Sequence, residues 1–404
     1  MRRRRRRVTE EIAMEVSKPG KGPFLAMMLA CLPNGVMSFA LPLYAHALGA
    51  SAVQVGICFT LASMTQLLCR PAVGWWMDRG DKRLFLVLGC VLQGLAFWSY
   101  AASREVSMLY LSAVVAAVAN SLVWTAALAL VAGRDRHVGE GMGRLESASA
   151  RGALIGAIPA FNAVGMFSLE RSWSFIMAAF AVGAVVAALA AWRMVPRTPP
   201  DPHAAMPLPV PDRRCLYRLL LLALLTALAG GMVLPVLVLF LSERFGAPSS
   251  TIAAAYVPAA LVLSILPAYA GRLVDRVGST GPLVAGLGLM AVAMLLMPWM
   301  THLSWLIALW VAEACGLALA VPAERKLVAG ICGARGGTVF GLYATVANAA
   351  TAVGPLVGGA AYQYLDHRAP FAVAAALLVL TAGLYLRWFG AGVHRSVGVA
   401  GVAS

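Results

Sequence analysis

Long apolar stretches separated by short charged segments dominate the pattern of the chain. Two of the stretches without Asp, Glu, Lys or Arg, Gly22–Cys69 and Val277–Ala312, run for 48 and 36 residues. A membrane-spanning helix needs roughly 20 apolar residues, so each of these holds two spans. A further span contains the lone Glu313. The pattern predicts twelve membrane helices, at 23–45, 53–76, 84–102, 108–131, 148–168, 173–193, 218–241, 250–273, 282–300, 304–323, 338–362 and 369–389.

Composition agrees with this pattern and excludes other classes. Of the 404 residues 61% are hydrophobic and 12% are charged, whereas soluble proteins carry about a quarter charged residues. The seven cysteines are scattered without a Cys-x-x-Cys pair, which indicates neither a disulfide framework nor a metal site. We find no phosphate-binding Gly-Lys-Ser/Thr loop and no nucleophile elbow. We therefore expect neither an enzyme nor an ATP-driven pump, and no cofactor.

The basic residues predict the orientation. One set of loops carries four arginines, each matched by a neighbouring acid: Arg104, Arg171, Arg244 and Arg368 beside Glu105, Glu170, Glu243 and Asp366. Most other Lys and Arg lie in the tails and opposite loops, so both termini are expected in the cytoplasm of a multi-pass protein of the cytoplasmic membrane. The net charge of +15 then meets anionic lipid headgroups rather than nucleic acid. We interpret Arg2–Arg7 as a disordered tail, or a start site assigned too early, rather than a signal peptide.

A proline-rich segment and an internal repeat divide the chain. Val195–Arg214 holds seven prolines, which forbid a regular helix. We predict a basic tail at 1–22, six-helix bundles at 23–193 and 218–389 joined by a cytoplasmic linker at 194–217, and a second tail at 390–404. Gly74, Asp78 and Arg79 are matched 197 residues later by Gly271, Asp275 and Arg276. Such a repeat in a polytopic chain indicates a transporter with its site between the halves.

The first copy carries a family resemblance. Arg70-Pro71 precedes Gly74, Asp78, Arg79, Lys82 and Arg83. This segment resembles the Gly-x-x-x-Asp-Arg-x-x-basic-basic signature of the major facilitator superfamily, and the resemblance covers almost the whole chain. It implies an all-α membrane fold with two six-helix bundles related by pseudo-two-fold symmetry, and alternating access to a site between them.

The charged segments are expected to join the halves. Glycine permits close helix approach, and Asp78 is suited to accept N–H groups at a helix N-terminus, for which the candidate is 336–338. Arg79, Lys82 and Arg83 can pair with acids or lipid phosphates. The resemblance implies a latch that holds the cytoplasmic face shut. The second copy would meet Arg144–Arg151 and be weaker, because Ser279-Thr280 replace the basic pair. The alternative for both is a tight turn with topogenic charge.

A glycine-proline motif lies in the span 338–362. Gly354, Pro355, Gly358 and Gly359 look like the family's Gly-Pro-x-x-Gly-Gly antiporter motif, where proline allows bending and glycine allows close packing. In the exporters that motif lies in helix 5. Helix 5 here offers Gly152, Gly156 and Pro159 in another order, which weakens the case for export.

Ionisable groups inside membranes are functional candidates by default. Glu313 is the proton-coupling candidate, with a hydrogen-bonded packing role as the alternative. Arg70 either pairs at a gate or binds an anionic substrate. Other polar and aromatic residues near the expected cavity could touch substrate or join helices: Asn34, Tyr44, Gln66, Asn120, Trp124, Asn162, Tyr256, Tyr343 and Asn348.

These residues predict a monomeric secondary transporter in the lipid bilayer. The favoured function is proton-coupled efflux of a drug or metabolite by alternating access. The alternative within this fold is uptake of a small organic solute by proton symport or facilitated diffusion. The alternative from another class is a non-transporting membrane receptor or assembly partner.

Overall fold

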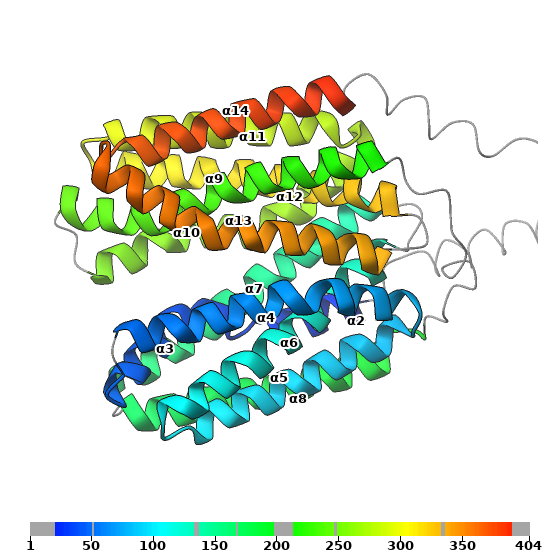
Figure 1. Cartoon of the computed structure of the whole chain (residues 1–404), viewed down its shortest axis with the longest axis vertical. Coiled ribbons are helices and arrows are strands. Elements are labelled where there is room, and N and C mark those ends of the chain that lie inside the picture. The colour runs from blue at the N-terminus through cyan, green and yellow to red at the C-terminus, as the bar shows by residue number, and fades with distance from the viewer. Residues whose placement is uncertain are drawn as a thin grey trace, which may run out of the picture.

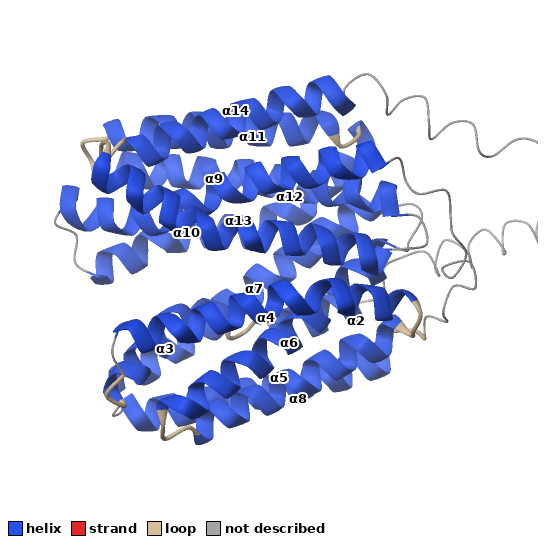
Figure 2. Cartoon of the chain, viewed as in Figure 1, coloured by secondary structure: helices blue, strands red, loops and turns tan. Residues whose placement is uncertain are grey.

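The structure is a computed structural model that describes residues 21–50, 52–132, 137–166, 169–197, 213–245, 249–332 and 336–389. Within these ranges the regular elements are helices and no strand occurs (Figure 2). The helices of the first half are α2 (Gly22–Ala30), α3 (Asn34–Ala47), α4 (Ala52–Asp78), α5 (Lys82–Ala102), α6 (Val106–Ala132), α7 (Val138–Met166) and α8 (Leu169–Met194). Those of the second half are α9 (Arg213–Phe245), α10 (Ser249–Val277), α11 (Thr280–Leu296), the 3₁₀ turn η2 (Met297–Trp299), α12 (Leu303–Cys332), α13 (Gly336–Tyr364) and α14 (Ala369–Phe389).

Each predicted span corresponds to a helix. One departure is the start of α9 at Arg213, inside the predicted linker, and three larger ones follow. The span 23–45 is broken between α2 and α3, where Pro33 precedes Asn34, and the path bends by 53° between Gly22–Met37 and Ala40–Ala47. The prediction of a start at 148 for the fifth span was wrong, because α7 already begins at Val138. The prediction of an end at 323 was also wrong, since α12 continues to Cys332. In both cases charged residues extend the helix beyond its apolar part.

Nine helices in the described ranges are long and apolar enough to cross a membrane, and the bent pair Gly22–Met37 and Ala40–Ala47 would make a tenth. The other two predicted spans correspond to α4 and α7, which carry charged residues such as Arg70 and Glu146 on the surfaces between the halves. The predicted tails lie almost entirely outside the described residues, as does most of the linker.

The helices form two bundles that lie side by side (Figure 1). Contacts across the boundary come mainly from two helix pairs, α4 with α13 and α7 with α10. Both bundles turn large apolar side chains outward, as a lipid-facing surface requires; Trp98 and Leu356 are examples. Inside the first bundle, Tyr44, Phe97, Tyr100, Trp173 and Phe180 pack into an aromatic cluster.

Candidate functional site

The first Gly-x-x-x-Asp segment joins α4 to the start of α13. Asp78 accepts hydrogen bonds from the backbone N–H groups of Gly337 at 2.7 Å and Thr338 at 2.8 Å, and from the Thr338 hydroxyl at 2.5 Å. A β-carbon at Gly74 would lie 2.3 Å from the Gly337 carbonyl oxygen. Asp78 thus caps a helix N-terminus, where the helix dipole favours an anion, and glycine permits the approach. This is the contact that the sequence predicts.

The second copy joins α10 to the start of α7. Asp275 accepts hydrogen bonds from the N–H groups of Gly139 at 2.9 Å and Glu140 at 2.7 Å. A β-carbon at Gly271 would lie 2.1 Å from the Gly139 carbonyl oxygen. The predicted partner region, Arg144–Arg151, was therefore placed too late on the correct helix. The cause is the start of α7 at Val138, which brings Gly139 to the N-terminus.

The charges around the second contact are more complete than its sequence indicates. Lys326 of α12 forms an ion pair with Asp275 at 2.8 Å. Arg272 forms an ion pair with Glu140 at 2.9 Å, and Glu140 also pairs with Arg144 at 2.8 Å. The second copy has Ser279-Thr280 where the first has two basic residues. Lys326 of α12 supplies a positive charge beside Asp275 in their place.

The basic residues of the signature stack on tryptophan rings. The Arg79 guanidinium lies 3.7 Å from the Trp75 ring centre, and that of Arg83 lies 4.3 Å from the Trp192 ring centre. Arg83 also donates a hydrogen bond to the Trp192 carbonyl. Lys82 begins α5, and Arg276 is exposed near the end of α10. Helices α4 and α10 end at the same end of the molecule, at Asp78 and Val277. We call this end the motif end.

Deeper in the boundary, Arg70 and three other predicted polar residues form one hydrogen-bonded group. The Arg70 guanidinium donates to the Gln66 side chain at 2.9 Å, to that of Asn120 at 3.5 Å and, across the boundary, to the Ala344 carbonyl at 3.2 Å. Asn348 of α13 donates to Gln66 at 3.3 Å. Arg70 is only 8% exposed. These side chains therefore connect the halves in the described structure.

A partly buried ion pair crosses the boundary nearby. Arg325 of α12 contacts Glu146 of α7, and its guanidinium lies 5.4 Å from the ring centre of Trp124 in α6. Trp124, a predicted cavity residue, thus supports a cation that comes from the opposite half. Breaking such a pair leaves a partly buried charge without its partner, which is destabilising.

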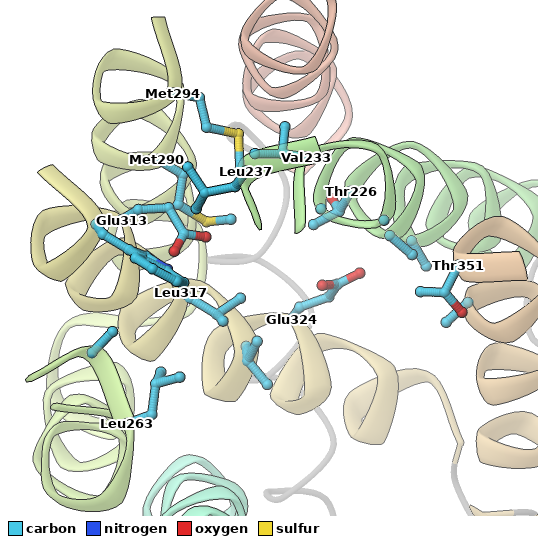
Figure 3. A pocket seen from close by; sticks show the side chains of 18 of the residues that line it. Thr226, Val233, Leu237, Leu263, Met290, Met294, Glu313, Leu317, Glu324 and Thr351 are labelled. Carbon is cyan, nitrogen blue, oxygen red and sulfur yellow. The ribbon is translucent and has the colours of Figure 1, made fainter. Parts of the chain in front are cut away.

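A cavity of about 470 Å³ lies within the second half, between α9, α10, α11, α12 and α13. Its wall is mostly Ala, Leu, Val and Met, with Tyr256, Trp310 and Tyr343 among the aromatic residues. Glu313 and Glu324 are the charged residues of the wall, and no Lys or Arg is among the lining residues. Figure 3 shows both carboxylates directed into the space between the helices. Glu313, Tyr256 and Tyr343 thus line a cavity, but this cavity lies within the second half and not between the halves, where the sequence places the site.

Other predicted residues lie elsewhere. Tyr44 is fully buried in the first half, stacked on Trp173 with ring centres 4.4 Å apart, and donates a hydrogen bond to the Ser103 carbonyl at 2.7 Å. Its place in the aromatic cluster contradicts the prediction of a cavity residue. Asn34 begins α3 at the break in the first span and is exposed. The side chain of Asn162 lies outside the described residues.

The glycine-proline motif packs α13 on α9. A β-carbon at Gly354 would lie 2.7 Å from the Gly231 carbonyl carbon, and one at Gly358 would lie 2.3 Å from the Met232 carbonyl oxygen. Gly359 has open space around it. Pro355 lies inside α13 and is exposed. Two of the three glycines therefore set the distance between these helices.

Several residues of the boundary and cavity were missed by sequence reasoning, namely Glu146, Glu324, Arg325 and Lys326. A signal for the two contact sites was available: Gly139 and Gly143 precede Gly337 and Gly341 by 198 residues, each pair spaced as Gly-x-x-x-Gly, a spacing that permits close helix approach. Glu324 follows Glu313 by 11 residues, which returns a helix to nearly the same face after three turns.

The two bundles, their boundary contacts and the lined cavity define an integral membrane transporter built from a duplicated unit. A family model described as Major Facilitator Superfamily matches residues 23–213 and 219–404. The chain belongs to the Major Facilitator Superfamily and has its duplicated two-domain fold.

Individual relatives are distant. Multidrug resistance protein 1 of Bacillus subtilis (strain 168) is 22% identical over 90% of this chain and 94% of its own length. The human organic anion transporter MFSD10 (TETRAN) has a TM-score of 0.73 at 21% identity, covering 90% of this chain and 98% of its own. The proton:xylose symporter XylE has a TM-score of 0.75 at 12% identity, covering 91% and 93%. The two structures support the fold alone.

Proposed function

We propose that the chain exports a small organic molecule in exchange for protons. The observation that carries this proposal is the apolar cavity of the second half, whose charged residues are the two carboxylates Glu313 and Glu324. An apolar wall suits an organic molecule rather than a hydrated ion or a sugar. The names of the relatives from Bacillus subtilis favour efflux of such molecules.

Glu313 is the proposed proton carrier. It lies near the middle of α12, where an ionisable group is costly and marks an ion or proton pathway. A carboxylate that exchanges its proton while the cavity faces either side of the membrane couples the two fluxes. If the substrate binds only when Glu313 is unprotonated, the substrate and the proton compete for binding in both the inward-facing and the outward-facing form.

The contacts at the motif end are the proposed gate. Asp78 and Asp275 each link the two halves, and the partly buried ion pair of Arg325 with Glu146 also joins them. Opening this end requires all of them to separate. The charge distribution of the sequence assigns this end to the cytoplasm, so we infer that the structure represents a form closed toward the cytoplasm. We place the protein in the cytoplasmic membrane as a monomer, with both termini inside.

The test is proton release from inverted membrane vesicles that are challenged with a panel of cationic, neutral and anionic organic compounds. Wild type is compared with Glu313→Gln and with Glu105→Gln, an exposed acid outside the cavity. Release that Glu313→Gln abolishes and Glu105→Gln retains supports the proposal. If both variants release protons equally, Glu313 is not the carrier.

The rival functions give other outcomes. A symporter loads right-side-out vesicles rather than inverted ones, and a facilitator moves labelled solute without protons. A receptor or assembly partner moves no solute in either vesicle. The Gly-Pro motif lies in α13 and not in α7, which is the fifth spanning helix. This position is the feature that favours the uptake alternative.

A further inference from the structure

We propose that the cavity of the second half is a binding site for a lipophilic organic cation, with the Glu324 carboxylate as its counter-charge. This proposal rests on the proposed function only in taking that cavity as the transport site. It makes no use of proton coupling, so it can fail or hold independently.

The buried carboxylate of Glu324 is the first observation. Its side chain is 3% exposed, and its Oε1 atom is buried without a hydrogen-bond partner. It lines the cavity and is directed into it (Figure 3). Tyr343 and Tyr385 interact with the Glu324 carboxylate as neutral hydroxyls and bring no positive charge. Because a buried charged group without a compensating cation is costly, a ligand that brings a positive charge to the free oxygen gains more than a neutral one.

The nearest cation is already committed elsewhere. Arg325 follows Glu324 directly, and one residue turns a helix by about 100°. The Arg325 guanidinium pairs with Glu146 in the opposite half and lies over the Trp124 ring. It reduces the field at Glu324, but its place at the boundary keeps it out of the cavity wall.

The charges of the cavity wall are both negative. Glu313 and Glu324 line the cavity, and no Lys or Arg is among its lining residues. The arginines of the boundary are held by contacts across it: Arg70 by the Ala344 carbonyl, Arg151 by the Ser264 carbonyl and Arg325 by Glu146. A bound cation therefore meets acids and no competing base in the cavity wall.

The rest of the wall fits the remainder of such a ligand. Trp310 and Tyr256 form an edge-to-face pair with ring centres 4.3 Å apart, and aromatic faces attract cations. Met290, Met294 and Met297 line the same space, and flexible thioethers adapt to ligands of different shape. The site therefore selects charge and size more than a particular functional group.

The experiment compares two ions of similar size and opposite charge on the purified full chain. Tetraphenylphosphonium and tetraphenylborate are titrated by calorimetry into protein in detergent, with protein-free micelles subtracted. We expect saturable binding of the phosphonium and none of the borate. Glu324→Gln should weaken phosphonium binding by roughly tenfold or more, while Glu324→Asp, which keeps the charge, should retain most of it.

Matched variants separate this result from loss of folding. Each variant must elute and melt as wild type does, and Glu105→Gln should bind normally. Equal binding of both ions, or phosphonium binding unaffected by Glu324→Gln in folded protein, overturns the proposal. Phosphonium binding without proton release in vesicles would leave this site intact and contradict only the proton-coupled function.

Discussion

The Asp78 carboxylate accepts a hydrogen bond from the backbone N–H of Gly337 at 2.7 Å, across the boundary between the two halves. The two residues are 259 positions apart in the sequence. The pseudo-equivalent Asp275 makes the same type of contact with Gly139 at 2.9 Å. In both, a carboxylate at the end of one helix caps the start of a helix from the other half. The duplicated segment therefore forms duplicated boundary contacts, and their strengths can be compared by mutation.

Asp78→Asn should open the motif end. Hydrogen bonds to charged groups contribute about 1.5–3 kcal/mol each, so the variant should shift the equilibrium between closed and open forms by more than tenfold. Spin labels at Lys82 and Val277, after replacement of the seven native cysteines, report the distance between the halves by double electron–electron resonance. We expect a longer distance population in the variant. An unchanged distribution would show that Asp78 does not hold this end closed.

Asp275→Asn should open the motif end at least as far as Asp78→Asn does. The reason is the ion pair of Asp275 with Lys326 at 2.8 Å, which the variant loses together with the two N–H contacts. Lys326→Met should give a smaller shift with the same labels, because the N–H contacts remain. A negligible effect of Asp275→Asn would instead support the weaker second latch that its sequence indicates.

Glu146→Gln should destabilise the closed form more than Glu146→Gln combined with Arg325→Met. The single change leaves the partly buried Arg325 guanidinium without its acid, at a cost below the roughly 3–5 kcal/mol of a fully buried pair, whereas the double change removes both charges. A double-mutant cycle read by the same label distances measures this coupling. Additive effects of the two single variants would indicate no interaction between the residues.

Gly358→Ala and Gly359→Ala form a matched pair in α13. The added carbon at 358 would lie 2.3 Å from the Met232 carbonyl oxygen, while the one at 359 meets open space. We expect Gly358→Ala to destabilise the protein by about 1–3 kcal/mol. Gly359→Ala should be neutral or stabilise by up to about 1 kcal/mol through helix propensity. The melting temperatures of the two purified variants test this difference in stability. Equal melting temperatures would exclude a packing role for Gly358.

The sequence predicts the fold better than it predicts the site, for physical reasons. The lengths of the apolar stretches and the repeat of Gly74–Asp78 in Gly271–Asp275 can be read locally in the sequence. A glycine four residues before a carboxylate already indicates close helix approach. The contact between Arg325 and Glu146 depends on how α12 and α7 are rotated, which no local pattern encodes. Tyr44 was misplaced for the same reason, since a tyrosine suits an aromatic core as well as a cavity.

Proton-driven accumulation in liposomes tests the central claim most directly. The purified chain is reconstituted in acid-inside liposomes with the membrane potential held at zero, and the compound that gave the largest proton release in vesicles is supplied in labelled form. We predict accumulation several-fold above the no-gradient control, lost on collapse of the gradient and absent in Glu313→Gln. Equilibration to the same level with and without the gradient would contradict proton-coupled export.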